Sequence, residues 1–310
     1  YYTQKGCRMD VIDCINTGKI SGGTGIGGIV GLSTAFVSGC TNSGAVTGSG
    51  ASIGGIVGEQ KAYGAVEGCE NTGDIINNGS GYGTGGIVGW VRYTGSGGAD
   101  YPLYAPIAVT GNTNSGSISG GSDGGGIIGT LYHVGKVEKN CNSAAAISGT
   151  TFAGGIIGNY QITNDQGVYV NYAELTLLHN CSSTPLDQIS ANCKGPIWYS
   201  NGNDTNQYAD GIKADYSHLL TKTEAVEPTC TETGNPEYHT CSVCGKTFAD
   251  EKGETELTAD RLVISADGHS MTKTEAKAAT ATEAGNNEYY TCSACGKVFK
   301  DAAGITETTP

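Results

Sequence analysis

A glycine-rich repeat is the feature of this sequence that most constrains its fold. The repeat reads C-x-N-x-G-x-[IV], then a variable loop, then G-G-I-[VI]-G, and its five copies begin at Cys14, Cys40, Cys69, Asn112 and Cys141. Successive glycine ends are 27, 31, 40 and 29 residues apart. A helix is excluded as the repeating unit, because each glycine in a helix interior costs about 1 kcal/mol and 40 of the 51 glycines precede residue 160.

The segments between the glycines favour short strands instead. Stretches such as "GKISG", "GAVTG" and "GSISG" alternate apolar and polar residues over a few positions. A period near 27–30 residues matches one coil of a solenoid whose coils stack by parallel pairing about 4.8 Å apart. We therefore predict an all-β protein that begins with a parallel β-helix, or β-solenoid, of about five coils. A decayed further copy begins at Cys181.

The repeated residues have distinct predicted roles in such a stack. The paired glycines allow positive φ and a close approach between coils at a corner. The isoleucine after them points inward and forms a ladder of Ile29, Ile56, Ile87, Ile127 and Ile156. The asparagine amides bond the turn backbone or stack from coil to coil, and they belong to Asn16, Asn42, Asn71 and Asn114.

The cysteines are predicted to form a second inward ladder, mostly of free, buried thiols. Ladder positions about 4.8 Å apart rarely have the Cβ directions that a disulfide needs. Cys7, Cys181 and Cys193 lie outside the regular part of this ladder. A disulfide is more plausible among these three, with Cys181 and Cys193 as the favoured pair.

Over about residues 7–160 the five copies resemble the GLUG repeat of bacterial surface proteins. That repeat occurs in large secreted, adhesin-like proteins and beside the protease domain of some immunoglobulin A1-specific metalloproteases. The resemblance implies a surface-exposed bacterial protein of β-structure and carries no catalytic residues over to this chain. The H-E-x-x-H motif of such a protease is absent from the sequence.

Two tyrosine-rich insertions interrupt the repeats, at about residues 90–110 and 159–179. Aromatic residues on loops that leave a rigid scaffold suit contacts with carbohydrate or protein. The alternative is that the insertions only cap or cover the side of the solenoid. The candidate ligand-contact residues are Trp90, Tyr93, Tyr101, Tyr104, Tyr169 and Tyr172.

A second repeat occupies the tail, with copies that begin at His218 and His269. The two copies are offset by 51 residues and are identical at 25 of 41 aligned positions. Each contains C-x-x-C-G-K, the form of a zinc knuckle, in which two thiolates across a tight turn bind one metal and the glycine accepts the turn conformation. The predicted modules are residues 216–268 and 269–310, after a solenoid at 1–215.

A structural zinc site needs four ligands, of which one knuckle supplies two. In the first module a Cys3His set is predicted from His218, Cys230, Cys241 and Cys244. In the second module Ala281 stands at the position of Cys230, which leaves His269, Cys292 and Cys295. Three alternatives stay open: a reduced pair in a decayed ribbon, a disulfide within each C-x-x-C, and one site shared by both pairs.

The tail is similar to the zinc-ribbon-like repeats found in several copies in secreted proteins of gut Firmicutes. This resemblance covers about residues 218–310 and implies spacer or stalk modules with structural zinc. His239 is replaced by Tyr290 in the second copy, so we expect His239 at the surface.

Charge and motifs exclude several functional classes. The formal net charge is −13 with no lysine or arginine stripe, which disfavours nucleic acid and anionic membranes as partners. No apolar run approaches 18 residues, so we expect no membrane insertion. The P-loop lysine motif is absent, and acidic residues such as Asp123 and Asp165 are expected to be solvated loop residues.

The sequence thus predicts a non-catalytic, extracellular fragment of a Gram-positive, adhesin-like surface protein that presents a binding surface on a rigid solenoid. Its partner is expected to be a host or community glycan or protein, and structural zinc is the only cofactor expected. Two alternatives remain: a carbohydrate-active β-helix enzyme, either polysaccharide lyase or hydrolase, and a passive structural spacer of a larger secreted protein.

Overall fold

The computed structural model describes residues 10–61, 64–92, 107–132, 135–161, 175–191, 193–195, 198–200, 212–215 and 217–309. The chain divides into two compact units, Tyr1–Leu219 and Leu220–Pro310. Strands and turns dominate the described residues, whose helical elements are the short 3-10 helices η1 (Leu186–Gln188) and η3 (Ala259–Arg261). No helix in these ranges is long and apolar enough to cross a membrane. The predicted all-β class is confirmed.

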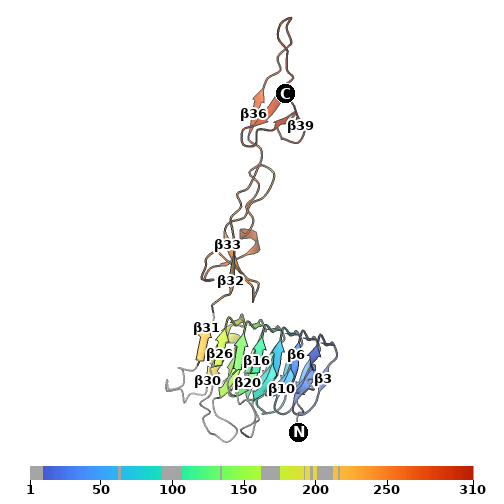
Figure 1. Cartoon of the computed structure of the whole chain (residues 1–310), viewed down its shortest axis with the longest axis vertical. Coiled ribbons are helices and arrows are strands. Elements are labelled where there is room, and N and C mark those ends of the chain that lie inside the picture. Colours follow the sequence, from blue (N-terminus) through green and yellow to red (C-terminus); the bar gives the residue numbers. More distant parts are fainter. Residues whose placement is uncertain are drawn as a thin grey trace. The chain divides into compact units, whose positions relative to one another are not determined.

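The first unit is a solenoid in which each coil adds one short strand to each of five parallel sheets, named here by their first strands (Figure 1). The β1 sheet contains β1 (Val11–Ile12), β6 (Phe36–Ser38), β11 (Ala65–Glu67), β16 (Ile107–Thr110), β21 (Gly135–Glu138), β26 (Leu175–Leu178) and β31 (Ile212–Asp215). The β2 sheet contains β2 (Ile15–Asn16), β7 (Thr41–Asn42), β12 (Glu70–Asn71), β17 (Thr113–Asn114), β22 (Cys141–Asn142) and β27 (Cys181–Ser182). The β3 sheet contains β3 (Ile20–Ser21), β8 (Val46–Gly48), β13 (Ile75–Asn77), β18 (Ile118–Gly120), β23 (Ile147–Ser148) and β28 (Ile189–Ser190).

The two remaining sheets meet at the glycine ends of the repeats. The β4 sheet contains β4 (Ile26–Gly27), β9 (Ile53–Gly54), β14 (Thr84–Gly85), β19 (Asp123–Gly125), β24 (Phe152–Gly154) and β29 (Cys193–Gly195). The β5 sheet contains β5 (Val30–Ser33), β10 (Val57–Lys61), β15 (Val88–Arg92), β20 (Ile128–Tyr132), β25 (Ile157–Gln161) and β30 (Trp198–Ser200). The copy that begins at Cys181 therefore lies in a coil that pairs in register with its predecessor.

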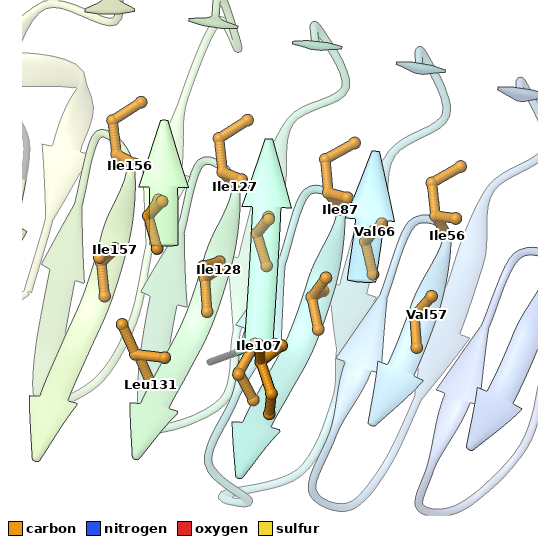
Figure 2. Packing of buried hydrophobic residues seen from close by; sticks show 14 of the residues in the cluster. Ile56, Val57, Val66, Ile87, Ile107, Ile127, Ile128, Leu131, Ile156 and Ile157 are labelled. Atoms are coloured by element: carbon orange, nitrogen blue, oxygen red, sulfur yellow. The ribbon is translucent and has the colours of Figure 1, made fainter. Parts of the chain in front are cut away.

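The predicted isoleucine ladder forms at the corner between the β4 and β5 sheets. Ile56, Ile87, Ile127 and Ile156 are fully buried and repeat once per coil, as Figure 2 shows. In the second to fifth copies the next residue is buried beside them. Two successive amides at this corner bond one carbonyl of the following coil. The amides of Ile56 and Val57, for example, both donate to the Ile87 carbonyl oxygen, at 3.0 and 2.9 Å.

The asparagine ladder also forms, and it makes both kinds of bond that the sequence suggested. Asn42 Nδ2 donates to Gly44 O at 2.9 Å within its own turn and to Asn71 Oδ1 of the next coil at 2.7 Å. The same coil-to-coil bond joins Asn16 to Asn42, Asn71 to Asn114 and Asn114 to Asn142. The Nδ2 of Asn42 thus donates within its own turn and to the next coil, while its Oδ1 accepts from the preceding coil, so this buried amide stays satisfied.

The paired glycines are needed because a side chain would collide with the next coil, and not because the backbone has a positive φ. In the first four copies the second glycine of the pair lies against the asparagine amide of the next coil, so that a Cβ on Gly55 would overlap Asn71 and one on Gly86 would overlap Asn114. Neither glycine has a positive φ. The C-x-N and G-G parts of the repeat are therefore two halves of one contact between coils.

The predicted ladder of buried cysteines is wrong in its first and last copies, since Cys14 is exposed. Cys40 and Cys69 are buried in it, but strand pairing matches Cys141 with Thr113 and with Cys181, one position further along. The ladder continues instead through Asn112, Asn140 and Asn180. These amides replace the thiols as hydrogen-bond donors. Asn112 Nδ2 donates to Val66 O, as Cys69 Sγ does to Val37 O. The expected Cys181–Cys193 disulfide stays a prediction, because the side chain of Cys193 lies outside the described part of the structure.

The second unit contains two four-stranded antiparallel sheets of the same topology. The first consists of β32 (Leu220–Thr223), β33 (Tyr238–Cys241), β34 (Thr247–Phe248) and β35 (Glu256–Leu257). The second consists of β36 (Met271–Thr274), β37 (Tyr289–Cys292), β38 (Val298–Phe299) and β39 (Glu307–Thr308). Contrary to the sequence prediction, His239 is only 9% exposed, because β33 lies between β32 and β34.

Candidate metal centre

Each module of the second unit contains a cysteine pair on a tight turn. In the first module the amide of Gly245 donates to the Cys241 carbonyl oxygen at 2.9 Å, and in the second Gly296 bonds Cys292 in the same way. Both glycines have a φ of 72°, in the left-handed region that other residues rarely adopt. The predicted role of the glycine in C-x-x-C-G-K is confirmed.

A histidine precedes the first strand of each module. His269 Nδ1 lies 3.6 Å from Cys295 Sγ, and its ring packs on Phe299 with 4.6 Å between ring centroids. Gly304 also lies close to this ring, since a Cβ on it would be 2.7 Å from His269 Cδ2. The imidazole is thus held between an aromatic ring and a glycine, and its nitrogen is directed at the cysteine pair.

Two groups of potential metal ligands result. His218, Cys241 and Cys244 form a three-residue group in which the ligand atoms lie within 4.8 Å of one another. The second group has four members, all within the same limit of one another: Cys230, His269, Cys292 and Cys295. Both groups could hold a metal ion.

The placement of Cys230 differs from the sequence prediction, which assigned it to the first module's own site. Cys230 lies near the tip of a hairpin between β32 and β33, closed by the bridge between Val226 and Asn235. The chain that leaves the first module runs back along this hairpin, with Ile264 bonded to Gly234 in both directions. His269 therefore begins the second module beside the tip that carries Cys230.

The spacing in the four-residue group fits a tetrahedral zinc ion. Zinc bonds of about 2.3 Å to sulfur and about 2.0 Å to nitrogen put tetrahedral neighbours about 3.8 Å (S to S) and about 3.6 Å (S to N) apart. Cys230 Sγ and Cys292 Sγ are 3.7 Å apart, and Cys295 Sγ is 3.6 Å from His269 Nδ1. The distance between the two sulfurs is also far too long for a disulfide.

The thiols of this group differ in acidity. The backbone N–H of Cys295 donates to Cys292 and lowers the pKa of the Cys292 thiol to about 5. Burial raises the pKa of the Cys230 thiol to about 11. Since only thiolates bind zinc strongly, Cys292 is ready to act as a ligand at neutral pH, whereas Cys230 has to lose a proton when a metal binds.

The solenoid buries one of its predicted contact residues. Trp90 is 5% exposed and lies edge-on to Tyr82 and Tyr132, with ring centroids 4.8 and 5.2 Å away. The guanidinium of Arg92 stacks 4.0 Å from the centre of its ring. The indole thus packs the outer side of β15 and is not a free loop residue. The other five candidates lie outside the described residues: Tyr93, Tyr101, Tyr104, Tyr169 and Tyr172.

Asp123 is also buried, at 2% exposure, although the sequence predicted a solvated loop residue. Its carboxylate accepts hydrogen bonds from Ser122 Oγ at 2.5 Å, Thr130 Oγ1 at 2.6 Å and Asn159 Nδ2 at 3.1 Å. These donors make burial tolerable for a charged group. Asp165 lies outside the described residues.

Comparisons of the chain with known protein families, curated proteins and solved structures found no match. The one ligand that the sequence assigned to a different site is Cys230. The sequence does contain a sign that Cys230 lies near the second module. Ala281 leaves the second copy of the repeat one potential ligand short, while the first copy has a cysteine at the same position.

Proposed function

We propose that this chain is a non-catalytic, adhesin-like extracellular protein that presents a binding surface on a rigid GLUG-type solenoid. The observation that carries the proposal is the position of the two tyrosine-rich insertions. The first follows β15 and returns at β16, and the second follows β25 and returns at β26. Both therefore leave from the β5 sheet and return to the β1 sheet, at one corner of the solenoid.

The strand ends from which the two insertions leave lie near each other as a result. Coils stack about 4.8 Å apart, so loops that leave the same corner two coils apart have roots about 10 Å from each other. Between these two coils, β20 and β21 are joined by residues 133–134 alone. Two long, aromatic segments on one edge of a packed scaffold are the arrangement expected of a binding surface for a glycan or a protein.

The short link offers a matched design for the test. Residues 93–106 and 162–174 are replaced, separately and together, by the dipeptide that naturally joins β20 to β21. We expect the intact chain to bind one class of ligand on a glycan or protein array, and the double replacement to lose that binding while its far-ultraviolet circular dichroism is unchanged. Turnover of any polysaccharide by the intact chain would favour the β-helix enzyme. Binding by neither form would favour a passive spacer.

For the tail we propose structural zinc held by its C-x-x-C pairs with the histidine of each module, which supports the modules as spacers. Cysteine and histidine are the ligands of closed, structural zinc sites, and two separations in the second module, Cys230–Cys292 and Cys295–His269, match a tetrahedral ion. We expect the reduced full chain to retain at least about one zinc per molecule after gel filtration, since one closed site binds one ion. Metal analysis by mass spectrometry measures this, and Cys295→Ser should remove that zinc. A reduced, folded chain that retains almost none would contradict the proposal.

A further inference from the structure

The four potential ligands of the second module come from two different repeats. Three of them, His269, Cys292 and Cys295, belong to the second copy, whereas Cys230 belongs to the first. We propose that Cys230 is the fourth ligand of the second module's metal site, so that one ion cross-links the two consecutive repeats. This inference rests on the zinc binding proposed for the tail.

Backbone contacts hold the donating hairpin against the second module's entry. Gly234 and Ile264 exchange two hydrogen bonds, at 2.9 and 2.8 Å. Further along the same connection, the amide of Asp267 donates to the Thr229 carbonyl oxygen at 2.9 Å. Cys230 follows Thr229 directly and His269 follows Asp267 by two residues, so the backbone pairing brings these two ligands together.

The hairpin itself is preformed for this role. Thr229 closes its tip, since its amide donates to the Glu232 carbonyl oxygen at 2.9 Å and its Oγ1 accepts from the Glu232 amide at 3.0 Å. The second repeat closes its tip in the same way, where Thr280 bonds Glu283. That tip carries Ala281 in place of the cysteine. The second hairpin therefore has the shape of the first without a ligand to donate, and the link runs from the first repeat to the second.

The pairing has a consequence for the connection between the modules. Residues 258–268 join β35 to the second module, and backbone hydrogen bonds hold this segment against the hairpin. A metal bound by Cys230 on one side and by His269 on the other closes this segment into a loop, which removes conformations that the open chain could adopt. Zinc would then set the stiffness between the repeats as well as stabilise one of them.

The test is the alkylation of Cys230 in the reduced full chain, followed by peptide mass spectrometry. With zinc bound, we expect Cys230 to react with iodoacetamide at least tenfold more slowly than after chelation. Cys295→Ser should abolish this protection, because it removes a ligand from the second module's site. Cys244→Ser should leave it unchanged, because Cys244 belongs to the other group of ligands.

Cys230→Ala supplies a second measurement that does not depend on thiol chemistry. Alanine already occupies the equivalent tip of the second repeat, so the substitution should leave the hairpin folded while zinc binds the second module at least tenfold more weakly. The matched control adds Ala281→Cys to Cys230→Ala. It restores the number of cysteines, and we expect it not to restore the affinity.

The possible results separate the two proposals. Protection that is lost in Cys244→Ser and kept in Cys295→Ser would place Cys230 in the first module and overturn the inference. A chain that binds zinc while Cys230 stays reactive, or that loses protection in both variants, would overturn it as well and leave structural zinc standing. A chain that binds no zinc would overturn both.

Discussion

Replacing Gly86 with alanine should prevent the solenoid from stacking. The added Cβ would overlap the Gly126 carbonyl oxygen of the next coil and the side-chain amide of Asn114. Neither can move away alone, because Gly126 lies in the paired backbone and Asn114 in the asparagine ladder. We expect a loss of about 4 kcal/mol or more in the free energy of unfolding, which is above the usual range for overpacking. Urea denaturation followed by circular dichroism measures it.

Gly23→Ala is the matched control for this substitution. Gly23 lies in the first coil, where an added Cβ would meet no atom within 4 Å, and it has no positive φ. Its replacement should change stability by no more than about 0.5 kcal/mol, as is usual for surface positions. Equal effects at the two glycines would mean that the close approach between coils does not explain the paired glycines of the repeat.

Asn71→Asp should be the next most damaging substitution. Asn71 Nδ2 donates to Gly73 O and to Asn114 Oδ1, both at 2.8 Å, and Oδ1 accepts from Asn42 at 2.7 Å. A carboxylate has no donor for the first two partners and repels both oxygens. Because each buried polar group left without a partner costs about 1–3 kcal/mol, we expect a loss of about 3–4 kcal/mol at neutral pH.

The pH dependence of this variant gives a further sign of its cause. Burial raises the pKa of the introduced carboxyl above its unfolded value, so the charge penalty acts at high pH and decreases as pH falls through the folded-state pKa. The difference from wild type, measured by urea denaturation at several pH values, should therefore shrink under acid conditions. The control is Asn78→Asp, at an exposed position of the same coil, which should cost about 0.5 kcal/mol or less. Similar losses in the two variants would contradict a role for the ladder.

Much of the solenoid could be read from the sequence, because its contacts repeat at a constant interval. A residue that recurs once per coil stacks on copies of itself, so the inward isoleucines and the asparagine amides were predictable without knowledge of the rest of the fold. The cysteine series shows where this reasoning ends. The sequence alignment matched Cys141 to Cys69 because both are cysteines. In the structure Asn140 occupies the ladder position that corresponds to Cys69, and its amide donates to a carbonyl as the thiol of Cys69 does.

The burial of single polar or aromatic residues could not be predicted from the sequence in the same way. Trp90, Asp123 and His239 occur once each and have no repeated equivalents, so their environment depends on neighbours that only the folded coils or strands bring together. Asp123 is buried because Thr130 and Asn159, on two other strands, supply donors to it. A sequence pattern contains no record of such partners.

The coil-forming repeat, its isoleucine and asparagine ladders and the cysteine turns of the tail follow from the sequence, because each depends on residues close in the chain or repeated at a fixed period. The tertiary structure alone shows that Cys230 lies beside the cysteine pair of the second module. Two nearly identical repeats make a ligand for its own module and a ligand for the next one indistinguishable in sequence. The path of the connection along the hairpin, fixed by the bonds of Gly234 with Ile264 and of Thr229 with Asp267, resolves the choice.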